Sequence, residues 1–110
     1  TELSADRHDE MIAFLSQLTH CIAVSLMCCK DSPCLKEYTG DSFRDLTRIA
    51  SINDEMWSEL FLLNKEKLLN EMALFKNSFD EMYNHLKNSN REGLQQMMKS
   101  STERRKSFNK

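Results

Sequence analysis

Apolar residues recur at helical spacing between Ser4 and Cys29. They form a wide arc of one helical wheel: Met11, Phe14, Leu15, Leu18, Cys21, Ile22, Leu26 and Cys29. The stretch from His20 to Cys29 carries no charged residue. A helix that is apolar nearly all round is normally buried on all sides. The pattern predicts one long helix over 4–29, whose second half packs against a second subunit.

A loop is predicted from Lys30 to Asp41, because the segments 31–33 (Asp-Ser-Pro) and 39–41 (Thr-Gly-Asp) are turn signals. Ser42, with Asp45 three positions later, predicts a capping box at the start of a short helix. The apolar side of this short helix is formed by Phe43, Leu46, Ile49 and Ala50.

Asn53 is the predicted N-cap of the next helix, which extends to about Lys87 with a bend near Asn64. A heptad seam follows its second part: Leu68, Met72, Phe75, Phe79, Met82 and Leu86. This spacing predicts packing against another helix. Ser89 and Glu92 form a second predicted capping box, which opens a weaker final helix.

Composition supports an all-α fold. The 110 residues include only two glycines and one proline, whereas a β-rich fold of this size needs many turns. The length suffices for one domain, so we expect a single helical domain over 1–110. The chain begins without Met, as expected of a domain excised from a longer protein.

The charge balance argues against two classes of partner. A net charge of −2 does not supply the basic field that a nucleic-acid binder or a membrane-surface binder needs. No apolar run approaches the ~20 residues of a membrane span, and no signal peptide is recognisable. We expect neither nucleic acid nor membrane as a partner.

Four cysteines are present, Cys21, Cys28, Cys29 and Cys34, and no two of them form a CxxC pair. Free thiols packed as small apolar side chains in a cytoplasmic protein are the favoured interpretation. A zinc site is the less favoured alternative.

Motifs that bind a cofactor are absent from the sequence, which has no GxGxxG, P-loop, GxSxG or HExxH. We therefore expect this chain alone to bind no cofactor and no metal. From the residues themselves, it is an accessory or oligomerising helical domain.

Two polar clusters are candidate ligand sites. Ser16 and His20 share a stripe of the first helix with Asp9, which suits a polar ligand, although a histidine on an apolar helix is more often a satisfied core residue. Arg48 offers a planar fork for a carboxylate, and Asp45 is placed to hold it. The alternative for the second cluster is a solvated polar face.

Two segments resemble signatures of the prephenate and arogenate dehydrogenases. The first, residues 8–23, contains HD and then AFLSQLTH and IA, which resembles HD…A..SxLPHxxA. The second, residues 43–51, reads FRDLTRIAS and resembles FrDxTRiA. Glu55-Met56-Trp57 and Asn64-Lys65 follow at the family's spacing. The resemblance extends from about His8 to Arg105, almost the whole chain.

The resemblance implies a two-domain enzyme of tyrosine biosynthesis. An N-terminal Rossmann domain, absent from this chain, would bind NAD or NADP and supply the catalytic histidine. The present part would be an all-α domain resembling the C-terminal domain of 6-phosphogluconate dehydrogenase-like enzymes, and would form a homodimer. The reaction implied is oxidative decarboxylation of prephenate to 4-hydroxyphenylpyruvate, or of arogenate to tyrosine, with tyrosine as an inhibitor.

Site residues carry over by position. Arg48 matches the arginine that binds a substrate carboxylate, and His20 matches the second histidine of the SxLPH segment. Ser16, Asp45 and Trp57 match neighbours that are expected to support them. In two places the chain departs from the family. Thr19 replaces the proline before that histidine, and the Gly-rich approach to the second motif is thinned to residues 39–42.

Three alternatives stay open at this point. The first alternative to a prephenate dehydrogenase domain is a structural oligomerisation module without a ligand. The second is an arogenate-specific dehydrogenase domain, and the third is a regulatory domain that binds an aromatic amino acid. Convergence of Ser16, His20 and Arg48 favours a ligand site over the structural module.

The isolated chain is predicted to have no dehydrogenase activity, because hydride transfer needs a nicotinamide that these residues cannot hold. An NAD reduction assay on the pure 110-residue protein checks this, and measurable turnover would contradict it. Activity should return in a full-length version.

Overall fold

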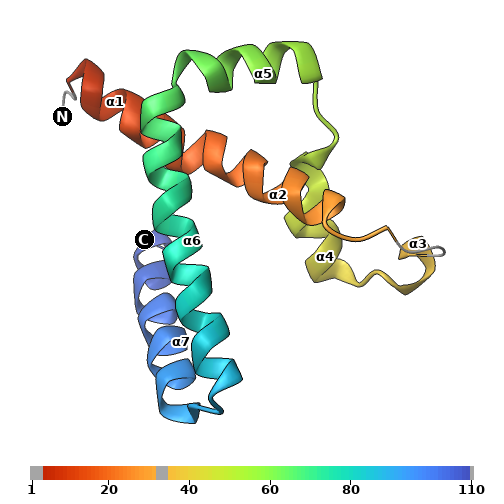
Figure 1. Cartoon of the computed structure of the whole chain (residues 1–110), viewed down its shortest axis with the longest axis vertical. Helices are drawn as coiled ribbons and strands as arrows, with labels where there is room; N and C mark the ends of the chain where they lie inside the picture. The colour runs from red at the N-terminus through yellow and green to blue at the C-terminus, as the bar shows by residue number, and fades with distance from the viewer. Residues whose placement is uncertain (1–3, 32–34, 110) are drawn as a thin grey trace. The chain divides into compact units, whose positions relative to one another are not determined.

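A computed structural model describes residues 4–31 and 35–109, which are helical with no strand. The elements are α1 (Ala5–Ile12), η1 (Ala13–Gln17), α2 (Leu18–Cys28), α3 (Leu35–Tyr38), α4 (Asp41–Thr47), η2 (Arg48–Ala50), α5 (Asp54–Leu63), α6 (Lys65–Lys87), α7 (Arg91–Lys106) and η3 (Ser107–Asn109). The predicted all-α class is confirmed (Figure 1). The chain divides into two compact units, Thr1–Met72 and Ala73–Lys110, with the boundary inside α6. That the chain is a single domain stays a prediction.

The helix predicted over 4–29 is confirmed as the continuous run of α1, η1 and α2 (Figure 1). Ser4 caps its start, because its side chain accepts a hydrogen bond from the Arg7 N–H at 3.1 Å. The middle of the run is a π-helical turn, in which the Leu18 N–H bonds to the Ala13 carbonyl five residues back. Such π-turns often occur at functional sites.

The loop predicted over 30–41 is partly wrong, because it contains α3. The capping box at Ser42 and Asp45 is also wrong, since α4 begins at Asp41 with Gly40 as N-cap. The Gly40 carbonyl accepts from the Arg44 N–H at 3.2 Å, so Ser42 and Asp45 lie inside the helix. Part of the predicted turn at 31–33 lies outside the described residues.

Both predictions for the following segment are confirmed. The Asn53 side chain accepts from the Met56 N–H at 3.0 Å and caps α5. The predicted bend at Asn64 is a break between α5 and α6, where Asn64 has φ −114° and ψ 29°.

The predicted capping box at Ser89 and Glu92 is wrong by one residue. Asn90 is the N-cap of α7, and its side-chain oxygen accepts from the Gly93 N–H at 3.0 Å. Ser89 instead has φ 52° and closes α6 in a Schellman arrangement. The Ser89 N–H bonds to Leu86 and the Asn90 N–H to His85, at 3.1 and 2.7 Å.

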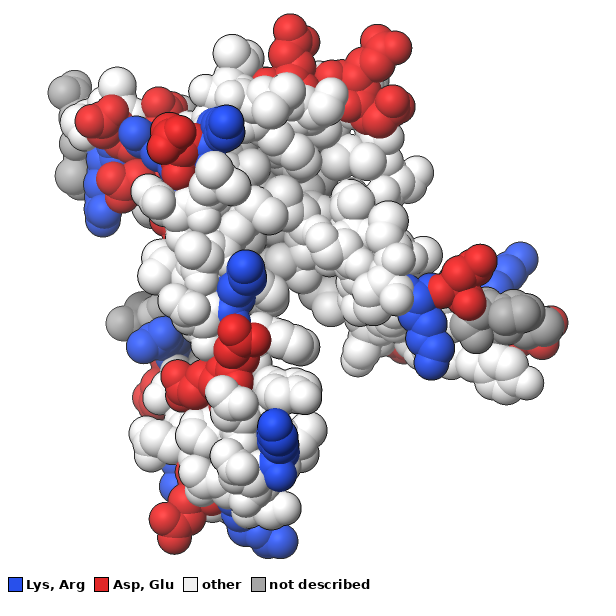
Figure 2. Space-filling view, in the orientation of Figure 1, with Lys and Arg blue, Asp and Glu red and all other residues white. Residues whose placement is uncertain are grey.

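Few apolar residues are buried within the described chain. They are Ala13, Leu18, Ala23 and Leu68, all of which belong to the first unit. The expected burial of residues 20–29 is therefore not achieved within the chain, since Met27 is 43% exposed. Figure 2 shows no charged side chain over the middle of α2 on the face drawn.

The second unit pairs the later part of α6 with α7, which run antiparallel (Figure 1). None of its described residues is buried. Part of the predicted heptad seam, Phe75, Phe79 and Met82, lines an open groove of about 470 Å³ with Met97 and Met98 of α7. The seam thus faces a helix, as predicted, but is not closed by it.

The run Ala5–Cys28 also passes a length and composition test for a membrane span. An 18-residue window has a mean hydropathy of 1.7, and 22% of that window is buried within the chain. The expectation that no apolar run approaches this length is therefore wrong, because the 18 residues 11–28 contain no Asp, Glu, Lys or Arg. Core helices of globular proteins can be equally long and equally apolar, so length and composition do not decide what covers this helix.

Gly93→Ala is predicted to destabilise the turn between α6 and α7. In an exposed helix this change usually adds about 1 kcal/mol of stability, but here the new Cβ would overlap the His85 ring and the Asn90 amide. We expect a loss of about 1–3 kcal/mol, measured by urea unfolding at fixed protein concentration.

Gly40→Ala is the matched control, since no atom lies within 4 Å of its added Cβ. Because alanine is a poorer N-cap than glycine, its unfolding free energy should fall by no more than about 1 kcal/mol. Stabilisation by Gly93→Ala would show that the His85 ring moves aside freely.

Candidate functional site

The five predicted site residues all lie in the first unit, on five different elements. They are Ser16 in η1, His20 in α2, Asp45 in α4, Arg48 in η2 and Trp57 in α5. The fold brings them to two sides of α2. Trp57 approaches at His20, while Asp45 and Arg48 approach at Thr19 and Ile22.

The His20 ring is held by two contacts. It stacks on the Trp57 indole with ring centroids 4.0 Å apart and an interplanar angle of 23°. Its Nδ1 lies 2.7 Å from the Ser16 carbonyl oxygen, which can only accept, so Nδ1 carries the proton and donates. Nε2 has no partner among the described residues and is available to a ligand, as an acceptor when neutral or as a donor when protonated.

Thr19 provides a second donor to the same carbonyl. Its Oγ1 donates to Ser16 O at 2.7 Å, so the Thr19 hydroxyl and the His20 ring share one acceptor. In the family pattern this position is a proline, which has no side-chain donor. The irregular backbone here is the π-turn that ends at Gln17, just before Thr19.

Arg48 is exposed and has no hydrogen-bond or ion-pair partner in the described ranges 4–31 and 35–109. It lines a small cavity of about 220 Å³ together with Thr19, Ile22, Asp45, Leu46 and Ile49. The expectation that Asp45 holds Arg48 is wrong, because the described residues contain no ion pair between them. Arg48 begins a 3₁₀ turn directly after α4, which ends at Thr47.

Arg44 differs from Arg48 in its surroundings. Its Nη2 donates to the Lys36 carbonyl at 3.2 Å, which directs the guanidinium toward α3. Arg44 is not among the residues that line the cavity at Arg48. The two arginines of the FRDLTR segment therefore have different roles in the fold.

In the described part of the chain, no hydrogen bond, ion pair or ring contact joins the His20–Trp57 pair to Asp45 or Arg48. Ser16 reaches His20 through its backbone carbonyl, and Arg48 lies beside Thr19, the residue before His20. The structure therefore brings Ser16, His20 and Trp57 together, and separately Asp45 and Arg48. Whether a ligand bridges the two groups stays a prediction.

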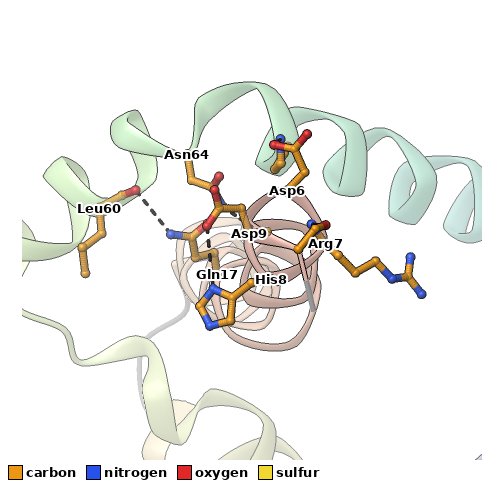
Figure 3. A network of polar contacts seen from close by, with 9 residues as sticks. Asp6, Arg7, His8, Asp9, Gln17, Leu60 and Asn64 are labelled. Atoms are coloured by element: carbon orange, nitrogen blue, oxygen red, sulfur yellow. Dashed lines mark hydrogen bonds and ion pairs between the residues drawn. The ribbon is translucent and has the colours of Figure 1, made fainter. Parts of the chain in front are cut away.

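A buried amide network was missed from the sequence. Gln17 is only 5% exposed. Its Nε2 donates to Leu60 O at 3.3 Å, and its Oε1 accepts from Asn64 Nδ2 at 2.9 Å. Asn64 Nδ2 also donates to Asp9 O at 3.1 Å (Figure 3). The available signal was a glutamine beside Leu18, in a part of the helix without charged residues.

The described cysteines, Cys21, Cys28 and Cys29, are free thiols. Cys21 is partly buried, and burial raises its pKa, while Cys28 and Cys29 are exposed. Packing of all the cysteines as small apolar side chains is therefore wrong for those two, and Cys34 lies outside the described residues. Within residues 4–31 and 35–109 no three His, Cys, Asp or Glu side chains are grouped to hold a metal.

Comparison with known proteins defines the family. The sequence profile described as "Prephenate dehydrogenase, dimerization domain" matches residues 4–100. The chain belongs to this family of helical dimerization domains. Prephenate dehydrogenase of Bacillus subtilis is 30% identical to it over 98 residues, which cover 84% of this chain and 26% of that protein. The chain thus spans about a quarter of the length of that relative.

Two solved structures share the fold. One is prephenate dehydrogenase from A. aeolicus in complex with hydroxyphenyl propionate and NAD+, with a TM-score of 0.86 and 28% identity. The match covers 96% of this chain and 39% of that one. The other is Synechocystis arogenate dehydrogenase, with a TM-score of 0.87 and 18% identity, over 96% of this chain and 41% of that one. At that identity the second similarity concerns the fold alone.

Proposed function

We propose that this chain is the substrate-binding and dimer-forming part of a prephenate dehydrogenase. The full-length enzyme would carry out NAD(P)-dependent oxidative decarboxylation of prephenate to 4-hydroxyphenylpyruvate. The family supports this assignment, as does the A. aeolicus relative, whose structure contains NAD+ and hydroxyphenyl propionate. The nicotinamide and the catalytic histidine would come from a nucleotide-binding domain elsewhere in the parent protein.

The observation that carries the proposal is the unpartnered guanidinium of Arg48. It lies at a cavity whose other walls include the apolar side chains of Ile22, Leu46 and Ile49. A planar guanidinium binds a carboxylate through two parallel hydrogen bonds, and apolar walls strengthen such a pair by limiting water. Prephenate carries carboxylates, so Arg48 would bind one of them.

His20 would bind a second polar group of the substrate. The Ser16 carbonyl fixes the proton on Nδ1, and the Trp57 indole covers one face of the ring. Nε2 is therefore presented in a defined direction. Ser16 and Trp57 act by orienting His20, whereas Asp45 lies at the cavity with Arg48.

Arogenate is the second candidate substrate, and Asp45 is the observation that favours it. Its carboxylate lines the same cavity as Arg48 without forming an ion pair with it among the described residues. Arogenate carries an ammonium where prephenate carries a ketone, so Asp45 and Arg48 together suit an amino acid group. Comparing both substrates with the wild-type enzyme and with Asp45→Asn distinguishes the two.

The dimer would be formed by a second copy of the chain over apolar surfaces that this copy leaves open. Large exposed apolar side chains occur in both units: Phe14 and Leu15 at 52% and 58%, and Phe79 and Leu86 at 59% and 67%. Large apolar side chains exposed in each unit favour an interaction site on each. The family takes its name from dimerization, which supports a homodimer.

Arg48→Ala in the full-length enzyme is predicted to raise KM about 30- to 150-fold with a smaller change in kcat. A bidentate arginine–carboxylate pair in a partly dry cavity contributes about 2–3 kcal/mol to binding. Removing the guanidinium should therefore weaken substrate binding more than it slows the chemical step. Arg48→Lys should restore only part of it, because an ammonium lacks the fork. Steady-state kinetics with prephenate and with arogenate give these values.

Arg44→Ala is the matched control, since its guanidinium bonds to the Lys36 carbonyl and lies outside the cavity. Equal kinetic damage from both alanine substitutions, or none from either, would show that the arginine or the cavity is wrongly assigned.

A further inference from the structure

Two contacts one helical turn apart join α5 to the long first helix. The first is the stack of His20 on Trp57. The second is the hydrogen bond from Gln17 to Leu60 O. Gln17 precedes His20 by three positions and Leu60 follows Trp57 by three positions, so each pair shares one face of its helix. The two helices are therefore antiparallel here, and the two contacts join them at positions one helical turn apart.

The hydrogen bond from Gln17 gives the Leu60 carbonyl the donor that α5 does not supply. Carbonyls of the last helical turn lack an N–H donor four residues later. At the end of α5 the Asn64 N–H bonds to Phe61 O at 3.2 Å, so Leu60 O loses its helical donor. Gln17 Nε2 takes that place. An apolar side chain of equal size would fill the space but leave Leu60 O without a bond.

Asn64 adds a second set of hydrogen bonds between the end of α5 and the first helix. Its single Nδ2 donates to both Gln17 Oε1 and Asp9 O, the first at the last residue of the π-turn and the second four residues before its start (Figure 3). The break between α5 and α6 is thereby tied to the first helix at two points. Every buried side-chain nitrogen and oxygen in the described ranges has a partner.

We propose that the Gln17–Asn64 amide pair is the positioning device that holds Trp57 against His20. Hydrogen bonds are directional, so the pair fixes how far α5 is shifted along the first helix, which apolar contact alone does not fix. A shift of α5 would separate the indole from the imidazole and leave His20 free to rotate. In this proposal the two amides act through the stack and not by contact with a ligand. The consequence for substrate binding rests on the proposed function, whereas the effect on the stack does not.

The stack is measured by NMR on the 110-residue chain. An indole at 4.0 Å shields the His20 ring protons, so their chemical shift reports the stack directly. Gln17→Met keeps the side-chain length and removes both polar atoms, and we expect it to lose most of this shielding while the chain stays helical. Retention of the wild-type His20 shift in folded Gln17→Met would overturn the proposal.

Leu18→Met is the matched control. Leu18 is the next residue and is 4% exposed, but it takes no part in the amide network. Its variant should keep the shielding, so equal loss in Leu18→Met would show that any disturbance of this helix separates the rings. Should Gln17→Met not fold, Asn64→Leu gives the same test at a partly exposed position, with the same expected loss and the same overturning result.

Kinetics of the full-length enzyme provide the second measurement. Gln17→Met should raise KM about tenfold, equivalent to about 1.4 kcal/mol, with kcat within about twofold. A lost stack with an unchanged KM would overturn the positioning role in binding. His20→Asn separates the two failures. If that variant also leaves KM unchanged, the proposed function fails, while the NMR result still decides whether the amides hold the stack.

Discussion

The first helix presents more apolar surface than the rest of the described chain covers, and the other features of the molecule depend on this. Only Ala13, Leu18 and Ala23 are buried among its apolar residues, although α2 carries no charge. Burying a large apolar side chain stabilises a fold by about 1.5–3 kcal/mol. Each side chain that stays in water leaves this contribution to the free energy of folding unrealised. A second copy that covers this helix would supply the missing burial.

The same helix organises the candidate site. Residues three apart share a face, whereas residues two apart point in nearly opposite directions. Gln17 and His20 therefore meet α5, while Thr19 and Ile22 border the cavity at Arg48. The first helix thus carries His20 on one side and contacts the turn of Arg48 on the other, although these two residues come from separate parts of the sequence.

Features set by local interactions could be predicted from the sequence. The helix over 4–29, the Asn53 cap and the break at Asn64 depend on residues within a few positions of one another. The start of α7 was misplaced because Ser89 closes the preceding helix in a left-handed conformation, which favours Asn90 as the cap.

The site was predictable only in part, for a different reason. Motif spacing identifies Arg48 and His20 as candidates, but it cannot show that Arg48 begins a 3₁₀ turn and forms no ion pair with Asp45 among the described residues. Nor does it give the partners of Gln17, since Leu60 and Asn64 are 43 and 47 positions away. Long-range hydrogen bonds of this kind follow from packing rather than from local pattern.

Sedimentation equilibrium of the 110-residue chain tests most directly whether a second copy covers the apolar helix. We expect a dimer at micromolar concentration, with twice the 12.9 kDa mass of the chain. Val24→Asp, which places a charge on α2, should cost about 3 kcal/mol or more and abolish that species. A stably folded monomer of 12.9 kDa at micromolar concentration would contradict the account.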